Sequence, residues 1–342
     1  MKIKQKIRGM IPEQVREWVW DTIRAPMNML GHYASDALRF WKHNIRSGRR
    51  SPKFLTKNMM TYTHMVEKGL SLREPRPFFG RDVVKRLMQL VDEPDAECGV
   101  SSEIITGVRR VLKSYVEFHE ERIENDEQEE YVSGIREFLA GHLGGMQDPE
   151  AVISQTRGDV LRIAAGGSVS EQLKSRHSVR VYDDRPVPIE TIMSAVETAQ
   201  SSPSACNLQP VRVYAITDRE LIEKALTVQG GARGFYSEVK LLFVMTYEIG
   251  LQIGPRSRNQ GYVDGGIFSQ NLMLALLQEG VGSCPLNWAQ ERSTDRAMRN
   301  LVGIKDSENI IMLIAAGFVP PEYSVARSQR VPVESIVSHV KS

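Results

Sequence analysis

The stretch PIETIMSAVETAQSSPSACNLQPVRVYAIT, residues 188–217, holds a predicted helix, loop and strand in direct succession. Residues 188–200 predict an amphipathic helix, because apolar residues recur on one face: Ile189, Ile192, Met193, Val196 and Ala199. Residues 211–217 predict a strand, and the small residues and prolines between them predict a rigid loop. This order favours helices layered on a sheet.

The same alternation continues toward the end of the chain. Predicted helices cover 218–226, 262–279 and 292–302, predicted strands cover 240–247 and 310–318, and a further short segment covers 283–286. Residues 241–244 are apolar at every position, which is typical of a strand buried on both faces. We therefore expect an α/β or α+β layer architecture for the second half of the chain.

The composition is that of a globular protein, with 342 residues, 41% of them hydrophobic and 25% charged. It excludes disordered and collagen-like proteins, and the length favours two domains. Three cysteines, Cys98, Cys206 and Cys284, are too few and too distant for a disulfide framework or a zinc site. The sequence shows no secretory signal, and its longest apolar run, 310–319, is about half of a bilayer span. We expect a soluble, cytoplasmic protein.

The amino-terminal half differs in pattern and in charge. Helical spacing dominates residues 12–140, and Pro26 is expected to bend or end the first helix. The glycine-rich stretch 141–170 is interpreted as a hinge with a short helix inside it. We place a domain boundary near residue 165, between a mostly helical region of unknown role, 1–165, and a second domain, 166–342.

Charge is distributed unevenly within the first half. Residues 1–50 carry eleven basic and four acidic side chains, whereas residues 101–150 carry five basic and twelve acidic ones. We expect the basic stretch to dock on the acidic segment 117–130, and the alternative is a weak contact with an anionic membrane surface. We expect no nucleic-acid partner, because the sequence carries no nucleic-acid-binding motif.

The usual catalytic motifs are absent from the sequence. It has no glycine-rich dinucleotide or Walker loop, no nucleophile elbow, no zinc-protease motif and no paired cysteines. His64 and Glu67 lie three residues apart on a helical face, but a satisfied surface pair is a better interpretation than a metal site. An enzyme of this kind would take its chemistry from a bound organic cofactor.

Two clusters are candidates for binding such a cofactor. In Arg176-His-Ser-Val-Arg180, two guanidinium groups and the Ser178 hydroxyl would share one side of an extended segment and suit a phosphate; a basic turn is the alternative. In Ser202-Pro-Ser-Ala-Cys-Asn-Leu-Gln-Pro210, Asn207 and Gln209 offer donors and acceptors to the edge of a flavin or pyrimidine. An ordinary helix-to-strand connection is the alternative there.

Together and in this order the clusters resemble the FMN-dependent nitroreductases. The likeness continues through Gly234-Phe-Tyr236, the helix from Asp264 to Ala275, the turn Gly280-Val-Gly-Ser-Cys-Pro-Leu-Asn287, the strand from Ile314 to Pro320, and the pair Arg327 and Arg330. It covers roughly residues 171–342. The resemblance implies a three-layer α+β fold, in which helices flank a mainly antiparallel sheet, and FMN sites at the interface of a homodimer.

The resemblance also implies roles at the site. The first cluster would hold the phosphate and the N1/O2 side of the ring, residues 203–207 would reach FMN from the partner subunit, and the closing arginines would cover the phosphate. The implied FMN-binding residues are Arg176, His177, Ser178, Arg180, Pro203, Ser204, Ala205, Asn207, Gln209, Pro285, Leu286, Asn287, Arg327 and Arg330. Trp288 is equally compatible with a lid over the flavin and with the core, and Asp264 is expected as a favourable acid at its helix N-terminus.

The activity implied by the resemblance is that of an oxidoreductase. NAD(P)H would pass a hydride to flavin N5 and leave, and a small organic acceptor would then use the same pocket, which predicts ping-pong kinetics. The protein would supply orientation and positive charge, so neither a catalytic side chain nor a metal is expected.

Two alternatives to this activity stay open. One is a flavin-dependent dehydrogenase or oxidase of the same superfamily in a biosynthetic pathway. It is favoured by the stretch His64–Ser71 with Glu74–Pro77, which is similar to extensions on relatives associated with bacterial surface-polysaccharide pathways. The other is a non-catalytic flavin-binding scaffold.

Overall fold

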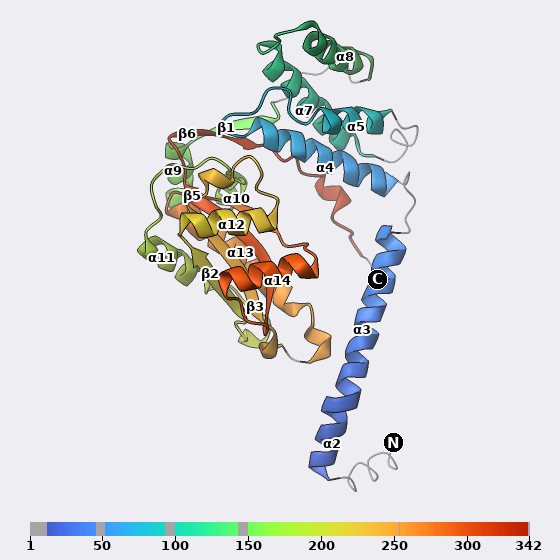
Figure 1. Cartoon of the computed structure of the whole chain (residues 1–342), viewed down its shortest axis with the longest axis vertical. Helices are drawn as coiled ribbons and strands as arrows, with labels where there is room; N and C mark the ends of the chain where they lie inside the picture. The colour runs from blue at the N-terminus through green and yellow to red at the C-terminus, as the bar shows by residue number, and fades with distance from the viewer. Residues whose placement is uncertain (1–11, 46–51, 93–99, 143–149, 253, 341–342) are drawn as a thin grey trace.

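The computed structural model describes residues 12–45, 52–92, 100–142, 150–252 and 254–340. Figure 1 shows a body built around a sheet, a group of helices above it, and a long amino-terminal helix that runs down one side.

A four-stranded antiparallel sheet forms the centre of the body. Its order is β2 (Val211–Ile216), β3 (Leu241–Glu248), β5 (Glu308–Phe318) and β4 (Val281–Asn287), so that β2 and β4 are its two edges. All three neighbouring pairs are antiparallel. In the central pair Val244 lies opposite Leu313, and the register shifts by one residue between Met245 and Thr246.

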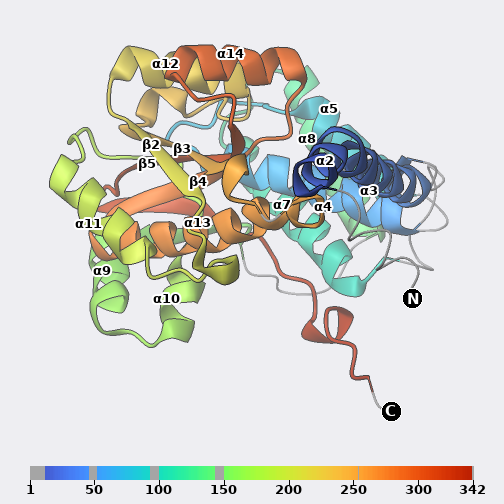
Figure 2. The same ribbon diagram turned by 90° about the horizontal axis from the view of Figure 1, so that it is seen from below.

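Helices cover both faces of this sheet, as Figure 2 shows. The flanking helices are α11 (Ile189–Ala199), α12 (Arg219–Gln229), α13 (Gln260–Gln278) and α14 (Arg292–Val302). Leu241, Phe243 and Met245 are buried in the core with α11 and α13, whereas Leu242 and Val244 are buried in the core with α12 and α14. Successive strand residues point to opposite faces, so burial on both faces explains the continuous apolar run. The predicted three-layer α+β fold is confirmed.

The helices of the amino-terminal half enclose an apolar core of their own. They are α4 (Pro52–Leu70), α5 (Arg81–Val91), α7 (Ser102–Glu120) and α8 (Asp126–His142). Fully buried side chains of this core include Leu55, Met59, Val84, Leu87, Val108, Val111, Leu112, Tyr115, Val132 and Ile135.

Residues 143–149 of the segment expected to be a hinge lie outside the described residues, and the rest, from residue 150 on, is an ordered connection. It contains β1 (Val152–Thr156), α9 (Arg157–Gly166) and α10 (Val169–Ser175). β1 pairs antiparallel with β6 (Glu322–Ala326), and Val160 and Ala164 of α9 are buried in the core of the sheet body. The hinge interpretation is wrong because the partner strand of β1 lies far along the chain. The boundary near residue 165 stays a prediction.

The amino-terminal helix is continuous but not uniform. It consists of α2 (Glu13–Val19), the π-helical η1 (Trp20–Arg24), α3 (Ala25–Phe40) and the π-helical η2 (Trp41–Ile45). Pro26 directly follows the π-helical turn η1, and the helix continues through it, so it does not end the helix. Short 3₁₀ turns elsewhere are η3 (Ala205–Asn207), η4 (Tyr236–Glu238), η5 (Ile249–Leu251), η6 (Pro255–Ser257) and η7 (Val333–Ser335).

The expected docking of this basic stretch on residues 117–130 is wrong for the described part of the stretch. α3 is held by an ion pair between Asp36 and Arg258, 2.6 Å apart, and Figure 1 shows α8 at the opposite end of the molecule. The acidic segment pairs locally instead, for example through Glu120 with Arg136. Among the helices described, none has the length and apolarity needed to cross a membrane.

Candidate active site

The predicted cluster of residues 176–180 lies along the free edge of β4. α10 is fixed at its start by a capping box between Ser168 and Glu171 and ends at Arg176. Beyond it the chain is extended: Ser178 bridges Ser283, whose carbonyl accepts a hydrogen bond from the Val179 N–H at 3.0 Å. A Cβ at Gly282 would lie 3.0 Å from the Cβ of Val179, so glycine permits this close approach.

The two guanidinium groups of this cluster have no counter-charge, although Arg180 is buried and Arg176 is half-buried. Arg180 is 4% exposed, and its Nε has no hydrogen-bond partner; Nη1 of Arg176 also has none. Burial lowers the pKa of Arg176, and the neighbouring Arg330 lowers it further. Within the described residues no carboxylate forms an ion pair with either arginine. Because an unpaired buried charge is costly, the site fits a bound anion such as a phosphate.

The closing pair of arginines lies beside the same cluster. Arg330 is exposed and donates to the Ser328 carbonyl at 2.7 Å, whereas Arg327 donates from Nε to the Glu150 carbonyl at 2.6 Å. Both lower the pKa of His177, together with Arg176. The structure therefore brings four of the predicted residues together, although Arg327 also ties the site to the segment before β1.

His177 plays a structural part in the cluster. Its Nδ1 lies 2.9 Å from the Ser175 carbonyl and 3.2 Å from Nε2 of Gln155. Burial is the largest cause of its lowered pKa, so the ring is neutral at pH 7. Nδ1 of the imidazole is used for local structure.

The predicted ring-contacting residues follow on β4. Pro285 is half-buried, Leu286 is buried and Asn287 is exposed. N–H and C=O groups alternate in direction along a strand, and the Ser283 carbonyl faces the free edge. Pro285 has no N–H, so Asn287 carries the next main-chain donor directed toward that edge.

Trp288 belongs to the core and is not a lid. Its side chain packs against the core that contains α12 and α14, and its indole N–H donates to Asp295 at 3.0 Å.

The second predicted cluster is shaped by backbone strain and by α13. Asn207 and Gln209 have positive φ angles, as has the exposed Cys206 between Ser204 and them. The Gln209 N–H donates to the Ser204 hydroxyl at 3.0 Å, and the Ala205 N–H donates to Asp264 at 3.3 Å. Pro203 and Ser204 line a cavity against Asp264 and Phe268.

Asp264 has a different role from the one expected. Its carboxylate is 3% exposed and accepts from Ala205 and from Nε2 of Gln260, and it lies beyond the first turn of α13. It holds the loop rather than capping the helix, and no local pattern predicts a partner fifty-nine residues away.

One chain does not bring the two clusters together. The loop precedes β2 at one edge of the sheet, and the arginines lie along β4 at the other edge. Three strand spacings separate these edges, roughly 14 Å. A single site that uses both clusters would need a second chain.

Sequence reasoning missed the residues that α4 brings to the arginines. The His64 ring lies 3.5 Å from the Arg180 guanidinium, and Lys68 donates to the Gly231 carbonyl at 2.7 Å. Glu67, expected at the surface, is 3% exposed and lies 3.9 Å from His64. No three metal-ligating side chains gather anywhere in the described ranges. The spacing of apolar residues predicts a helix here, but it does not predict which residues that helix packs against.

Comparison with known proteins supports the interpretation of this half. The sequence model of the Nitroreductase family matches residues 173–232 and 229–318. An Archaeoglobus fulgidus protein, provisionally named an NADH dehydrogenase/NAD(P)H nitroreductase, is 25% identical over 156 residues, which cover 44% of this chain and 86% of that protein. The Cr(VI) reductase of Pseudomonas sp. is 30% identical over 128 residues, and the NAD(P)H-dependent FMN reductase of Bacillus subtilis is 27% identical over 132.

The chain spans about half the length of the last two relatives, 53% of each, and the matches cover 34% of this chain. The family match includes all four strands of the central sheet, the arginine cluster and the loop before β2. All three relatives are named as reductases or dehydrogenases. The carboxy-terminal half of this chain is therefore similar to the Nitroreductase family over residues 173–318.

Proposed function

We propose that the carboxy-terminal half binds FMN and transfers a hydride from NAD(P)H to a small organic acceptor. The observation that carries the proposal is a pair of arginines, the buried Arg180 and the half-buried Arg176, without a carboxylate partner in the described chain, beside the free edge of β4. The name of the Bacillus subtilis relative supports FMN as the cofactor and NAD(P)H as the donor.

The residues present fit this cofactor. Arg176 and Arg330 would bind the phosphate, Arg180 would lie at the N1/O2 side of the ring, and Asn287 would offer a main-chain donor. Bound FMN would supply hydride acceptance and donation. The protein contributes charge and orientation, so a single pocket used in turn by donor and acceptor predicts ping-pong kinetics.

An absorbance spectrum of the purified protein tests this proposal. We expect a yellow protein that releases FMN on heating, identified by mass, and that is bleached rapidly by NADPH or NADH without oxygen. Indifference to both nicotinamides would favour a dehydrogenase or oxidase that uses another donor. A colourless protein that takes up no added FMN would overturn the proposal.

The proposed enzyme is a homodimer in which each site uses both chains. The two clusters lie at opposite edges of the sheet in one chain. In addition, α13 exposes an apolar stripe of Tyr262, Val263 and Ile267 to solvent. A two-fold symmetric contact would bury this stripe and bring the loop of one chain to the arginines of the other.

Complementation between two defective variants tests the shared site. Arg176→Ala with Arg180→Ala removes the arginines, and Asn207→Ala with Gln209→Ala removes the loop contacts. Each variant alone should bind little FMN, whereas a random mixture of co-expressed chains should regain about a quarter of the sites, because half of the dimers would then carry one intact site. A mixture that binds no more FMN than the variants alone would contradict the shared site.

We also propose a weak contact between the amino-terminal helix and an anionic membrane surface. Its exposed apolar side chains are Trp18, Met27, Leu30, Leu38, Phe40 and Trp41. Arg24, Arg39 and Lys42 on the same helix suit anionic lipid headgroups. Removal of residues 1–50 should abolish sedimentation with anionic vesicles but not FMN binding; equal sedimentation of both proteins would contradict the contact.

A further inference from the structure

Helix α4, which lies outside the part matched by the family model, passes along the proposed FMN site. Near its middle, His64 lies 3.5 Å from the guanidinium of Arg180. One turn further, Nζ of Lys68 donates to the carbonyl of Gly231 at 2.7 Å. Just beyond the helix, Leu72 packs so closely on Gly234 that an added Cβ would lie 2.9 Å from it.

The earlier turns of α4 face the other end of the site. A cavity of about 190 Å³ is lined by Met60, Thr63, His64 and Glu67 of α4 and, across from them, by residues 328–331. This second wall includes Arg330, which also lies beside Arg176. α4 therefore extends from the arginines of the phosphate end to the loop at Gly231.

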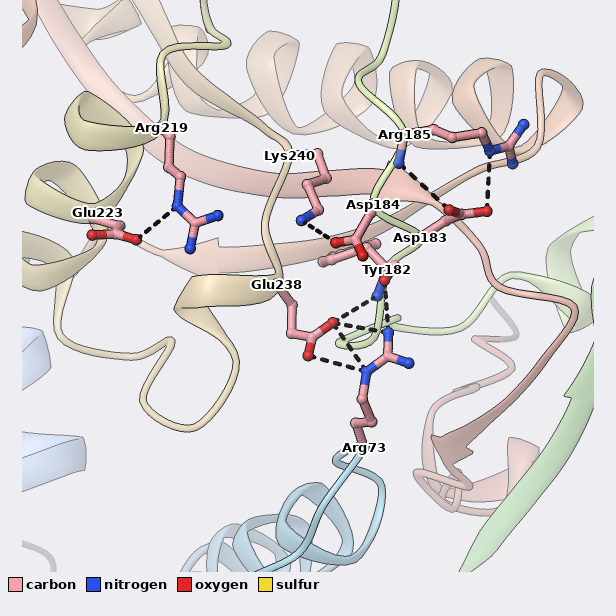
Figure 3. A network of polar contacts seen from close by, with 9 residues as sticks. All are labelled: Arg73, Tyr182, Asp183, Asp184, Arg185, Arg219, Glu223, Glu238 and Lys240. Carbon is pink, nitrogen blue, oxygen red and sulfur yellow. Dashed lines mark hydrogen bonds and ion pairs between the residues drawn. The ribbon is translucent and has the colours of Figure 1, made fainter.

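Two sets of contacts fix α4 in this position. On its other side Leu55, Met59, Val66 and Leu70 are buried in the helical core. After the helix, Arg73 forms an ion pair with Glu238 at 3.0 Å and donates to the Tyr182 carbonyl at 2.7 Å, as Figure 3 shows. The position of the Lys68 side chain is thus fixed by the packing of α4 in the helical core and by the contacts of Arg73.

Lys68 brings a further positive charge to a place that already holds one. Burial lowers its pKa, and the nearby Arg180 lowers it further. Nζ lies 5.6 Å above the Phe235 ring, and no carboxylate of the described residues forms an ion pair with it. An ammonium has three N–H donors, of which the Gly231 carbonyl takes one. Two remain, and His64, one turn earlier on the same helix, lies 3.5 Å from Arg180.

We propose that Lys68 is a cofactor-binding residue, which the helical region supplies to the Arg180 end of the FMN site. This inference rests on the proposed function. Two cations at that end bind negative charge on the ring more strongly than Arg180 alone, so they favour reduced over oxidised FMN. The helical region then sets the affinity and the potential of the cofactor, and is part of the redox site.

Titration of the apoprotein with FMN, followed by a measurement of the midpoint potential, tests this role. Lys68→Met should weaken FMN binding about tenfold, the loss expected for a charged hydrogen bond. If reduced FMN loses tenfold more than oxidised FMN, the midpoint potential falls by about 30 mV. Lys57→Met is the matched control, because Lys57 is an exposed lysine of the same helix, and it should leave both quantities unchanged.

Two further variants separate charge from local structure. Lys68→Gln keeps a donor for the Gly231 carbonyl but no charge, so its potential should match that of Lys68→Met, whereas Lys68→Arg should restore it. A wild-type potential in Lys68→Gln, or unchanged binding and potential in Lys68→Met, would overturn the role of Lys68 and leave the proposed function standing. A wild-type protein that binds no FMN would overturn both.

Discussion

The helical region and the sheet body place their charges differently. In the helical region most ion pairs lie at the surface, as in Arg81 with Glu127 at 2.8 Å and Arg136 with Glu120 at 3.0 Å, although Glu67 and Arg110 are buried. In the sheet body Arg180 is buried and Arg176 half-buried, and no described carboxylate pairs with them. A surface pair contributes little and requires no ligand, whereas buried unpaired cations cost free energy that a bound anion would offset. The difference locates the site.

The largest effect should come from removing those buried cations. Arg176→Ala with Arg180→Ala should weaken FMN binding by roughly two orders of magnitude or more, because each charged hydrogen bond contributes about 1.5–3 kcal/mol. Without FMN the same variant should be at least as stable as the wild type, because the cost of burying the charges is gone. Fluorescence titration and thermal unfolding measure the two quantities.

Arg136→Ala is the control from the helical region. It removes a paired arginine at the surface, so FMN binding should not change. Loss of binding in this control, or full FMN occupancy in the double variant, would break the contrast between the two regions.

A second prediction concerns the separate cores. Leu112 lies in the helical core and Leu313 in the sheet core, both 0% exposed. Leu112→Ala should cost about 2–5 kcal/mol of stability. Because the cores share no buried side chain, this loss should appear in hydrogen exchange of α7, while β3 and β5 keep their protection.

Leu313→Ala should show the opposite pattern, with faster exchange in β3 and β5 and unchanged protection in α7. Equal loss of protection in both regions for either variant would show that the chain unfolds as a single unit.

The sequence predicted the elements whose stability is local. The spacing of Ile189, Ile192 and Val196 predicted α11, and the apolar run at 241–244 predicted β3 at the centre of the sheet. The resemblance placed the arginine cluster and the loop in the correct order along the chain. The periodicity of apolar residues predicts which side chains share one face of a helix or strand.

Contacts between distant segments could not be predicted in the same way. Val152 pairs with Ala326, and Lys68 contacts Gly231, although neither local stretch differs from an ordinary strand or helix. The same holds for Asp264, whose role depends on a loop that folds back onto α13. The resemblance named candidate site residues in the second half, whereas nothing in the sequence placed α4 beside them.

The smallest predicted effect is a loss of stability of the helical region in acid. His119 is fully buried and is surrounded by aromatic rings; its ring centroid lies 4.0 Å from that of Tyr115. Its Nδ1 lies 2.6 Å from the Tyr115 carbonyl, and Nε2 has no partner in the described structure. Burial is the largest cause of its lowered pKa. The pKa of His177 in the sheet body is lowered as well, mainly by burial and then by the arginines around it.

Both histidines therefore bind a proton more readily in the unfolded chain. Above the unfolded pKa of about 6.5 neither state is protonated and stability does not depend on them. Below it the unfolded chain gains a proton first, so the free energy of unfolding falls by at most about 1.4 kcal/mol per pH unit and group. Hydrogen exchange at pH 7.5 and 5.5 should show this loss in α7, and His119→Phe should remove it.

In the sheet body, bound FMN should shrink the corresponding loss of stability, because its phosphate offsets the cations beside His177. A helical region whose pH dependence also shrinks with FMN would instead couple His119 to the site.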